Sequence, residues 1–143
     1  MADKGFSDAE RDAMKQRAEE LRSTKGLKGA AKKARELEAC VAAIDELTGL
    51  DREVGAMLHR IVSEEAPDLD PKTFYGFPAY ARDGKVVVFW QPASKFDTRY
   101  GTVSFDEEAA LDDGDMWSVS YAVVGMSDAV EKKIRELVKK AAG

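Results

Sequence analysis

Hydrophobic positions recur at helical spacing near both ends of the chain and at strand spacing in between. Residues 7–23 open with Ser7 and Glu10, which have the spacing of a capping box, and predict a first helix with a thin apolar stripe. The segment 24–49 predicts a second helix, because its apolar residues recur every three or four positions: Ala30, Ala34, Leu37, Val41, Ile44 and Leu47. We expect this N-terminal arm, residues 1–48, to pack on the rest of the chain or on a second copy.

A third helix is expected to begin after Asp51, as its N-cap, and to end before Pro67. Strand patterns then predominate, with a tight hairpin turn at 82–84 and a short acidic helical turn at 106–114. Ser127 is expected to cap the last helix, whose apolar stripe runs to Ala141. The predicted strands cover residues 73–77, 78–81, 85–91, 100–105 and 116–124.

The order of these elements predicts the fold class. Strands grouped between helices, with a hairpin among them, are typical of an α+β fold with an antiparallel or mixed sheet. Strand 85–91 is apolar on both faces, so we expect it to be central in the sheet. The whole chain, 1–143, is expected to be one domain, in which the arm 1–48 precedes a core of residues 49–143.

Composition is that of a globular protein outside the membrane. Apolar residues make up 44% of the 143 residues, which is enough for a core, yet no apolar run approaches the roughly 20 residues of a membrane span. The N-terminal segment lacks the apolar stretch of a signal peptide, and the single cysteine, Cys40, fits a reducing compartment. We therefore expect a cytoplasmic protein with no membrane partner.

Charge is distributed unevenly along the chain. The charged residues of segment 22–35 are all basic and those of segment 106–115 are all acidic, so the molecule should be electrically polarised. Each cluster fits a solvated surface. The net charge of -5 argues against nucleic acid as a partner, because binding to phosphates depends on positive charge.

Residues 58–143 resemble the YdhG-like group, a family of small bacterial domains with a frataxin-like α/β sandwich. The resemblance rests on Gly76-Phe77-Pro78-Ala79-Tyr80, which is similar to the family's Gly-(Met or Phe)-Pro-x-aromatic element. A turn at Gly84 and a valine-rich strand follow, as they do in that family. The resemblance implies a frataxin-like fold with the N-terminal arm added to it, and it implies little about function because fold alone does not determine function.

Some members of the family have been described as iron chaperones by analogy with frataxin, so iron is the candidate cofactor that the resemblance implies. Frataxins hold metal weakly on an acidic ridge along the helix before the sheet and on the adjoining edge strand. Carboxylates are suitable ligands for such hard cations. Basic residues interrupt the ridge in this chain, where the matching positions are Glu64, Glu65, Asp68 and Asp70.

Nothing in the sequence indicates catalysis. Nucleophilic catalysis needs a base beside the nucleophile and a third group that orients the base. His59 has no acid four residues away on either side, and Cys40 is expected to be a buried, inert thiol. One histidine and one cysteine also exclude a structural zinc site. We favour a protein that is not an enzyme; the least favoured alternative is an enzyme whose site is assembled from His59 and distant carboxylates.

Aromatic residues gather in and around the predicted strands, either as core or as the lining of a ligand pocket. The core interpretation requires the arm to cover the second face of the sheet, and the pocket interpretation requires it to leave a cleft. The break between Tyr75 and Tyr80 is the most informative part, because Pro78 belongs at a sheet edge or bulge. The candidate ligand-binding residues are Tyr75, Gly76, Phe77, Pro78, Tyr80, Trp90, Lys95, Arg99 and Tyr100.

These observations favour a non-enzymatic binding protein, which holds a small molecule at the aromatic face or binds iron weakly at the four acids. The alternative is a structural or interaction module in which the arm pairs with another chain, for example in a homodimer.

Overall fold

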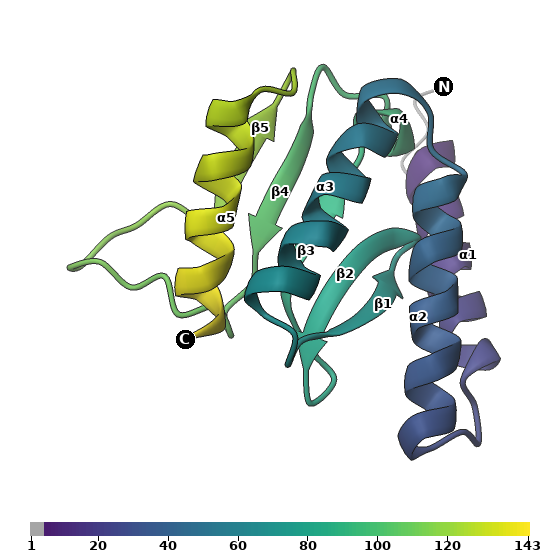
Figure 1. Ribbon diagram of the computed structural model, residues 1–143. Helices are drawn as coiled ribbons and strands as arrows, with labels where there is room; N and C mark the ends of the chain where they lie inside the picture. Colours follow the sequence, from purple (N-terminus) through teal and green to yellow (C-terminus); the bar gives the residue numbers. More distant parts are fainter. Residues whose placement is uncertain (1–4) are drawn as a thin grey trace.

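The computed structural model describes residues 5–143, and in it the chain forms an α+β fold with one antiparallel sheet (Figure 1). The predicted fold class is confirmed; the first four residues of the predicted arm lie outside the described residues. The strands lie in the sheet in chain order: β1 (Asp70–Phe74), β2 (Phe77–Arg82), β3 (Lys85–Gln91), β4 (Gly101–Phe105) and β5 (Ser120–Val123). The helices are α1 (Asp8–Ser23), α2 (Gly29–Asp45), α3 (Gly49–Glu65), α4 (Ala93–Phe96) and α5 (Asp128–Ala142).

Helices α3 and α5 cover one face of the sheet and enclose the core (Figure 1). Trp90 and Tyr80 are the largest fully buried side chains, and both lie on this helical side of the sheet. The indole N–H of Trp90 donates to the carbonyl oxygen of Asp51 over 2.9 Å, so the one polar group of this side chain is satisfied. The expectation that β3 is central is confirmed, since β2 and β4 flank it.

Helix ends agree with the sequence where a cap is present and differ where one is not. Ser7 forms the predicted capping box with Glu10, and Ser127 caps α5 by accepting from the N–H of Val130. The prediction that Asp51 is the N-cap of α3 is wrong, because this helix begins at Gly49. The Asp51 carboxylate instead accepts from the N–H of Ser94 over 3.2 Å and fixes the start of α4, a helix that the sequence analysis did not predict.

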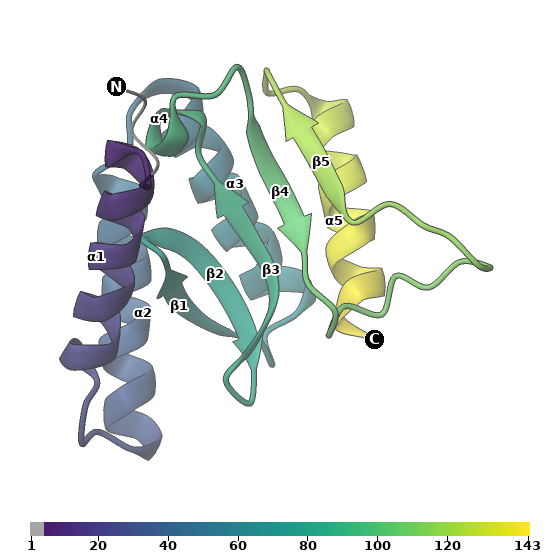
Figure 2. The same cartoon turned by 180° about the vertical axis from the view of Figure 1, so that it is seen from behind.

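The segment between β4 and β5 also differs from the prediction. Residues 106–114 form turns without a helix, and the last strand covers only Ser120–Val123 of the expected 116–124. The segment projects away from the sheet in Figure 2. Ala109 and Leu111 are buried in the core, whereas Met116, Trp117 and Val119 are exposed. Strand periodicity in the sequence therefore continues beyond the part of the chain that can pair with β4.

Two tight hairpins join the first three strands. The predicted turn at 82–84 is confirmed, with Asp83 and Gly84 at φ 52° and 80°. Tyr75 and Gly76 form a second turn of this kind, with φ 53° and 84°, so the expected strand 73–77 is interrupted. Pro78 lies in the inner strand β2 and not at an edge, but the pairing of β2 with β3 begins only at Ala79. Its missing N–H therefore costs no hydrogen bond to β3.

The arm lies along the β1 edge of the sheet and does not cover the second face (Figures 1 and 2). Ile44 and Leu47 of the predicted apolar ladder are buried, whereas Leu37 and Val41 are exposed, so only the C-terminal part of the ladder packs on the body. Helix α1 has no buried residue. Within residues 5–143, none of the helices combines the length and apolar character that a membrane crossing requires.

Candidate functional site: a groove between the arm and the first hairpin

A groove of about 290 Å³ lies where the two arm helices meet β1 and the Tyr75–Gly76 turn. Small side chains of α2, among them Ala39, Ala42 and Ala43, leave room for it. Charged residues line the rest, and Gly76 and Lys95 lie at the end nearest the turn. The groove therefore combines a small apolar surface with several ionic groups, which is a composition suited to a small polar ligand.

Glu20 connects the arm to the hairpin turn. Its two carboxylate oxygens accept from the backbone N–H groups of Tyr75, at 3.1 Å, and Gly76, at 2.7 Å. Both turn residues have positive φ, which directs successive N–H groups to one side, where they can bind an anion. The guanidinium of Arg17 lies 3.3 Å from the same carboxylate and over the ring of Phe74, with 5.3 Å to its centroid.

We expect Glu20→Ala to loosen α1 from the sheet. This helix buries no side chain, so the bonds from Glu20 are a large part of what positions it. Hydrogen exchange at the N–H groups of Tyr75 and Gly76 should accelerate by at least about tenfold, as expected when charge-assisted hydrogen bonds of about 1.5–3 kcal/mol are lost. Glu19→Ala, which removes a neighbouring carboxylate that makes no such bond, is the control. Unchanged exchange in Glu20→Ala would show that other contacts hold α1.

Lys95 is a cation of the groove that lies beside the hairpin turn. It is half-buried, and its ammonium lies close to Gly76: a Cβ built on that glycine would be 3.3 Å from the Lys95 nitrogen. Its backbone N–H donates to the carbonyl oxygen of Pro92, but within residues 5–143 its ammonium forms no ion pair or hydrogen bond. Lys72 differs, because its ammonium lies 3.6 Å from the Glu36 carboxylate. No carboxylate of the described residues lies within ion-pair distance of the Lys95 ammonium, although Glu20 also lines the groove, so this cation can pair with an anionic group of a ligand.

The structure brings together only some of the predicted ligand-binding residues. Gly76 and Lys95 line the groove, while Tyr80, Trp90 and Pro78 are buried in the sheet. Tyr75 and Phe77 belong to a ring cluster on the second face that also includes Phe74, Phe89 and Phe96. Arg99 and Tyr100 lie in the exposed segment before β4, with the guanidinium 5.1 Å from the ring centroid. The aromatic residues are therefore neither all core nor all pocket lining, because some of the rings lie in the core and others lie on partly exposed surface.

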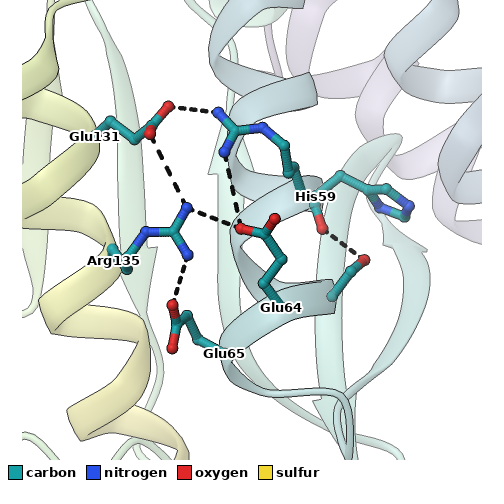
Figure 3. A network of polar contacts seen from close by, with 7 residues as sticks. His59, Glu64, Glu65, Glu131 and Arg135 are labelled. Atoms are coloured by element: carbon teal, nitrogen blue, oxygen red, sulfur yellow. Dashed lines mark hydrogen bonds and ion pairs between the residues drawn. The ribbon is translucent and has the colours of Figure 1, made fainter.

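The predicted metal ligands lie at the end of α3 and the start of β1, among basic side chains. Figure 3 shows Arg135 of α5 between Glu64 and Glu65, and the guanidinium lies 2.8 Å from the Glu64 carboxylate. These acids hold the pKa of Arg135 above its usual value. Asp70 lies 3.5 Å from the ammonium of Lys33, and Asp68 is exposed. In the described part of the chain no three His, Cys, Asp or Glu side chains are grouped so that they could hold a metal ion.

A buried polar cluster joins the arm to the core, and the sequence did not indicate it. The hydroxyl of Tyr80 lies 3.0 Å from Nδ1 of His59 and 3.8 Å from Sγ of Cys40, which come from β2, α3 and α2. Burial raises the pKa of Cys40 to about 11, raises that of Tyr80 and lowers that of His59, so all three are neutral near pH 7. Cys40 was expected to be a buried, inert thiol, and a thiol that remains protonated is a poor nucleophile.

Comparison of the chain with protein-family models, with curated proteins and with solved structures finds no match. The geometry of the groove is therefore the basis for a functional conclusion.

Proposed function

We propose that this protein is a non-enzymatic binding protein whose ligand, a small molecule with an anionic group, occupies the groove between the arm and the first hairpin. The observation that carries the proposal is Lys95, a half-buried cation without an ionic partner in the described residues, next to the backbone of Gly76. The ammonium would contact the anionic group of the ligand, and the alanines of α2 would contact its carbon atoms.

The resemblance to the YdhG-like group is part of this proposal. The helix α3, the antiparallel strands and the C-terminal helix α5 follow the order on which that resemblance rests, which supports it. The proposal includes no catalytic step. The polar cluster with the most altered pKa values, at Tyr80, lies among core side chains, and its thiol is protonated at neutral pH.

The test is a titration with simple anions that differ in size and charge: acetate, succinate, citrate and inorganic phosphate. A ligand that binds the folded state raises the melting temperature, because at about 100 times its Kd it adds about 2.7 kcal/mol to the free energy of unfolding. We expect at least one of these anions to produce such a shift, with Lys95→Ala reducing the affinity by at least about tenfold, since a charge-assisted hydrogen bond contributes 1.5 kcal/mol or more.

Two further variants make the result specific to the groove. Ala43→Leu places a larger side chain in the groove and should abolish binding while Lys95 remains present. Lys139→Ala removes an exposed lysine of α5 that lies outside the groove, and binding should be unchanged. Equal affinity in wild type, Lys95→Ala and Ala43→Leu, or no shift with any of the anions, would contradict the proposal.

A further inference from the structure

Strand β5 forms the edge of the sheet opposite the arm, and among residues 5–143 no strand lies beside the outer side of its backbone (Figure 2). The N–H of Phe105 donates to the carbonyl oxygen of Val119 over 2.7 Å, and Tyr121 pairs with Val103. In an antiparallel ladder, hydrogen-bonded positions alternate along a strand. The backbone groups of Val119 and Tyr121 are therefore directed to β4, and those of Ser120, Ala122 and Val124 are directed away from the sheet.

Apolar side chains are exposed at both ends of this edge. Met116 is 87% exposed and Val124 is 69% exposed, and Trp117 and Val119 are also exposed. The sequence from Met116 to Ser127 contains no charged residue and no proline, in a chain of which 34% is charged. Natural sheet edges are usually protected from pairing by lysine, proline or a bulge. This edge has only its short length as protection.

We propose that the β5 edge is the interface through which two copies of this chain pair, antiparallel, into one continuous sheet. The charge pattern favours a second copy as the occupant, because an uncharged edge meets an identical edge without repulsion, although each copy carries a net charge of -5. A strongly charged partner strand would find no counter-charge between Met116 and Ser127.

The positions of the apolar side chains also agree with a two-fold axis. An antiparallel pair centred on Ala122 places Ser120 opposite Val124 of the second copy, and both residues have outward-directed backbone groups. The axis also brings the Trp117 end of each edge toward the Val124 end of the other. The dimer therefore contains two equivalent contacts of this kind, and each covers apolar surface that is exposed in the single copy. An interface of this kind is isologous and closes at the dimer. It lies on the opposite side of the sheet from the arm (Figure 1), which is the surface through which two chains pair in the alternative interpretation of the sequence.

Sedimentation velocity across a protein concentration series tests the proposal. Wild type should change from monomer to dimer as concentration rises. Ala122→Pro removes an outward N–H group that forms no hydrogen bond within the sheet of one chain. Ala122→Lys places two like charges close together at the two-fold axis. Both variants should remain monomeric and should have a circular dichroism spectrum like that of wild type. Ala129→Pro, in the first turn of α5 where proline is tolerated, is the matched control and should dimerise as wild type does.

A double substitution in the arm, Leu37→Glu with Val41→Glu, separates this interface from the alternative one, because it adds charge to the exposed apolar face of α2. Dimerisation should be unchanged in this variant. The proposal is overturned if wild type is monomeric at every concentration, if both Ala122 variants still dimerise, or if the arm substitutions abolish the dimer and the Ala122 variants do not.

Discussion

Gly101→Ala is expected to destabilise the protein more than any other exchange of a glycine for alanine at negative φ. A Cβ at position 101 would lie 2.3 Å from Cη2 of Trp90 and 2.9 Å from the carbonyl oxygen of Gln91. Trp90 is fully buried and its indole N–H is bonded to Asp51, so it cannot move without losing that bond or displacing core side chains. Overpacking of a close-packed core typically costs about 1–3 kcal/mol, and we expect the upper end of that range or more.

Urea unfolding of Gly101→Ala beside a matched variant measures this effect. Gly125→Ala is the control, because no atom lies within 4 Å of a Cβ built there. In a double-mutant cycle with Trp90→Phe, the smaller ring should relieve the clash, so that Gly101→Ala costs at least about 1 kcal/mol less in that background. Equal free energies of unfolding for Gly101→Ala and Gly125→Ala would show that the β3–β4 backbone adjusts without strain.

The parts of the fold that the sequence predicted are those in which burial follows from local periodicity. Helix α5 is an example: Ile134, Leu137, Val138 and Ala141 recur at helical spacing and are all buried. The turn at Asp83 and Gly84 is another, because Asp-Gly is a strong local signal for a hairpin. In both cases residues that are close in the sequence determine the local structure, and contacts with distant residues stabilise it further.

Where packing depends on distant residues, the sequence alone was insufficient. The apolar ladder of α2 predicted a helix correctly, but it did not show that Leu37 and Val41 would remain exposed, which depends on where the helix lies against β1. The alternation from Met116 onward predicted a longer strand, but the strand that pairs with β4 covers only Ser120–Val123. The Tyr75–Gly76 turn lacks the usual Asn or Asp, and the carboxylate of Glu20, distant in sequence, binds its N–H groups.

Some residues of the candidate site were predicted from the sequence, and others were not. Gly76 and Lys95 were expected near a ligand, and both line the groove. Arg17 and Glu20 could not be found from sequence, because α1 shows only a thin apolar stripe and no motif. The sequence indicated only that a helix with so little apolar surface needs polar contacts to hold it against a sheet, and it did not show which of the charged residues of α1 make them.

The second large effect is expected at alkaline pH and originates in the buried cluster around Tyr80. The pKa of Cys40 is about 11 in the folded protein and 9.0 for an unperturbed thiol, mainly because burial disfavours the thiolate. Since the folded pKa is the higher one, the protonated thiol contributes its full stability below about pH 9, and this contribution is lost as the pH rises to about 11. The pKa of Tyr80 is also raised, which adds a loss of the same sign at higher pH.

The free energy of unfolding should therefore fall between about pH 9 and pH 11, with up to about 2.7 kcal/mol of the fall due to Cys40, at 1.36 kcal/mol per pH unit. Urea unfolding at several pH values in this window measures the decline. Cys40→Ala is expected to be less stable than wild type near pH 7, because it removes a buried side chain, but to lose less stability as the pH rises. Because Cys40 also contributes to the raised pKa of Tyr80, the difference between the two slopes measures the thiol together with its coupling to Tyr80. Parallel pH profiles would mean that the thiolate is tolerated beside Tyr80 and that the cluster does not control alkaline stability.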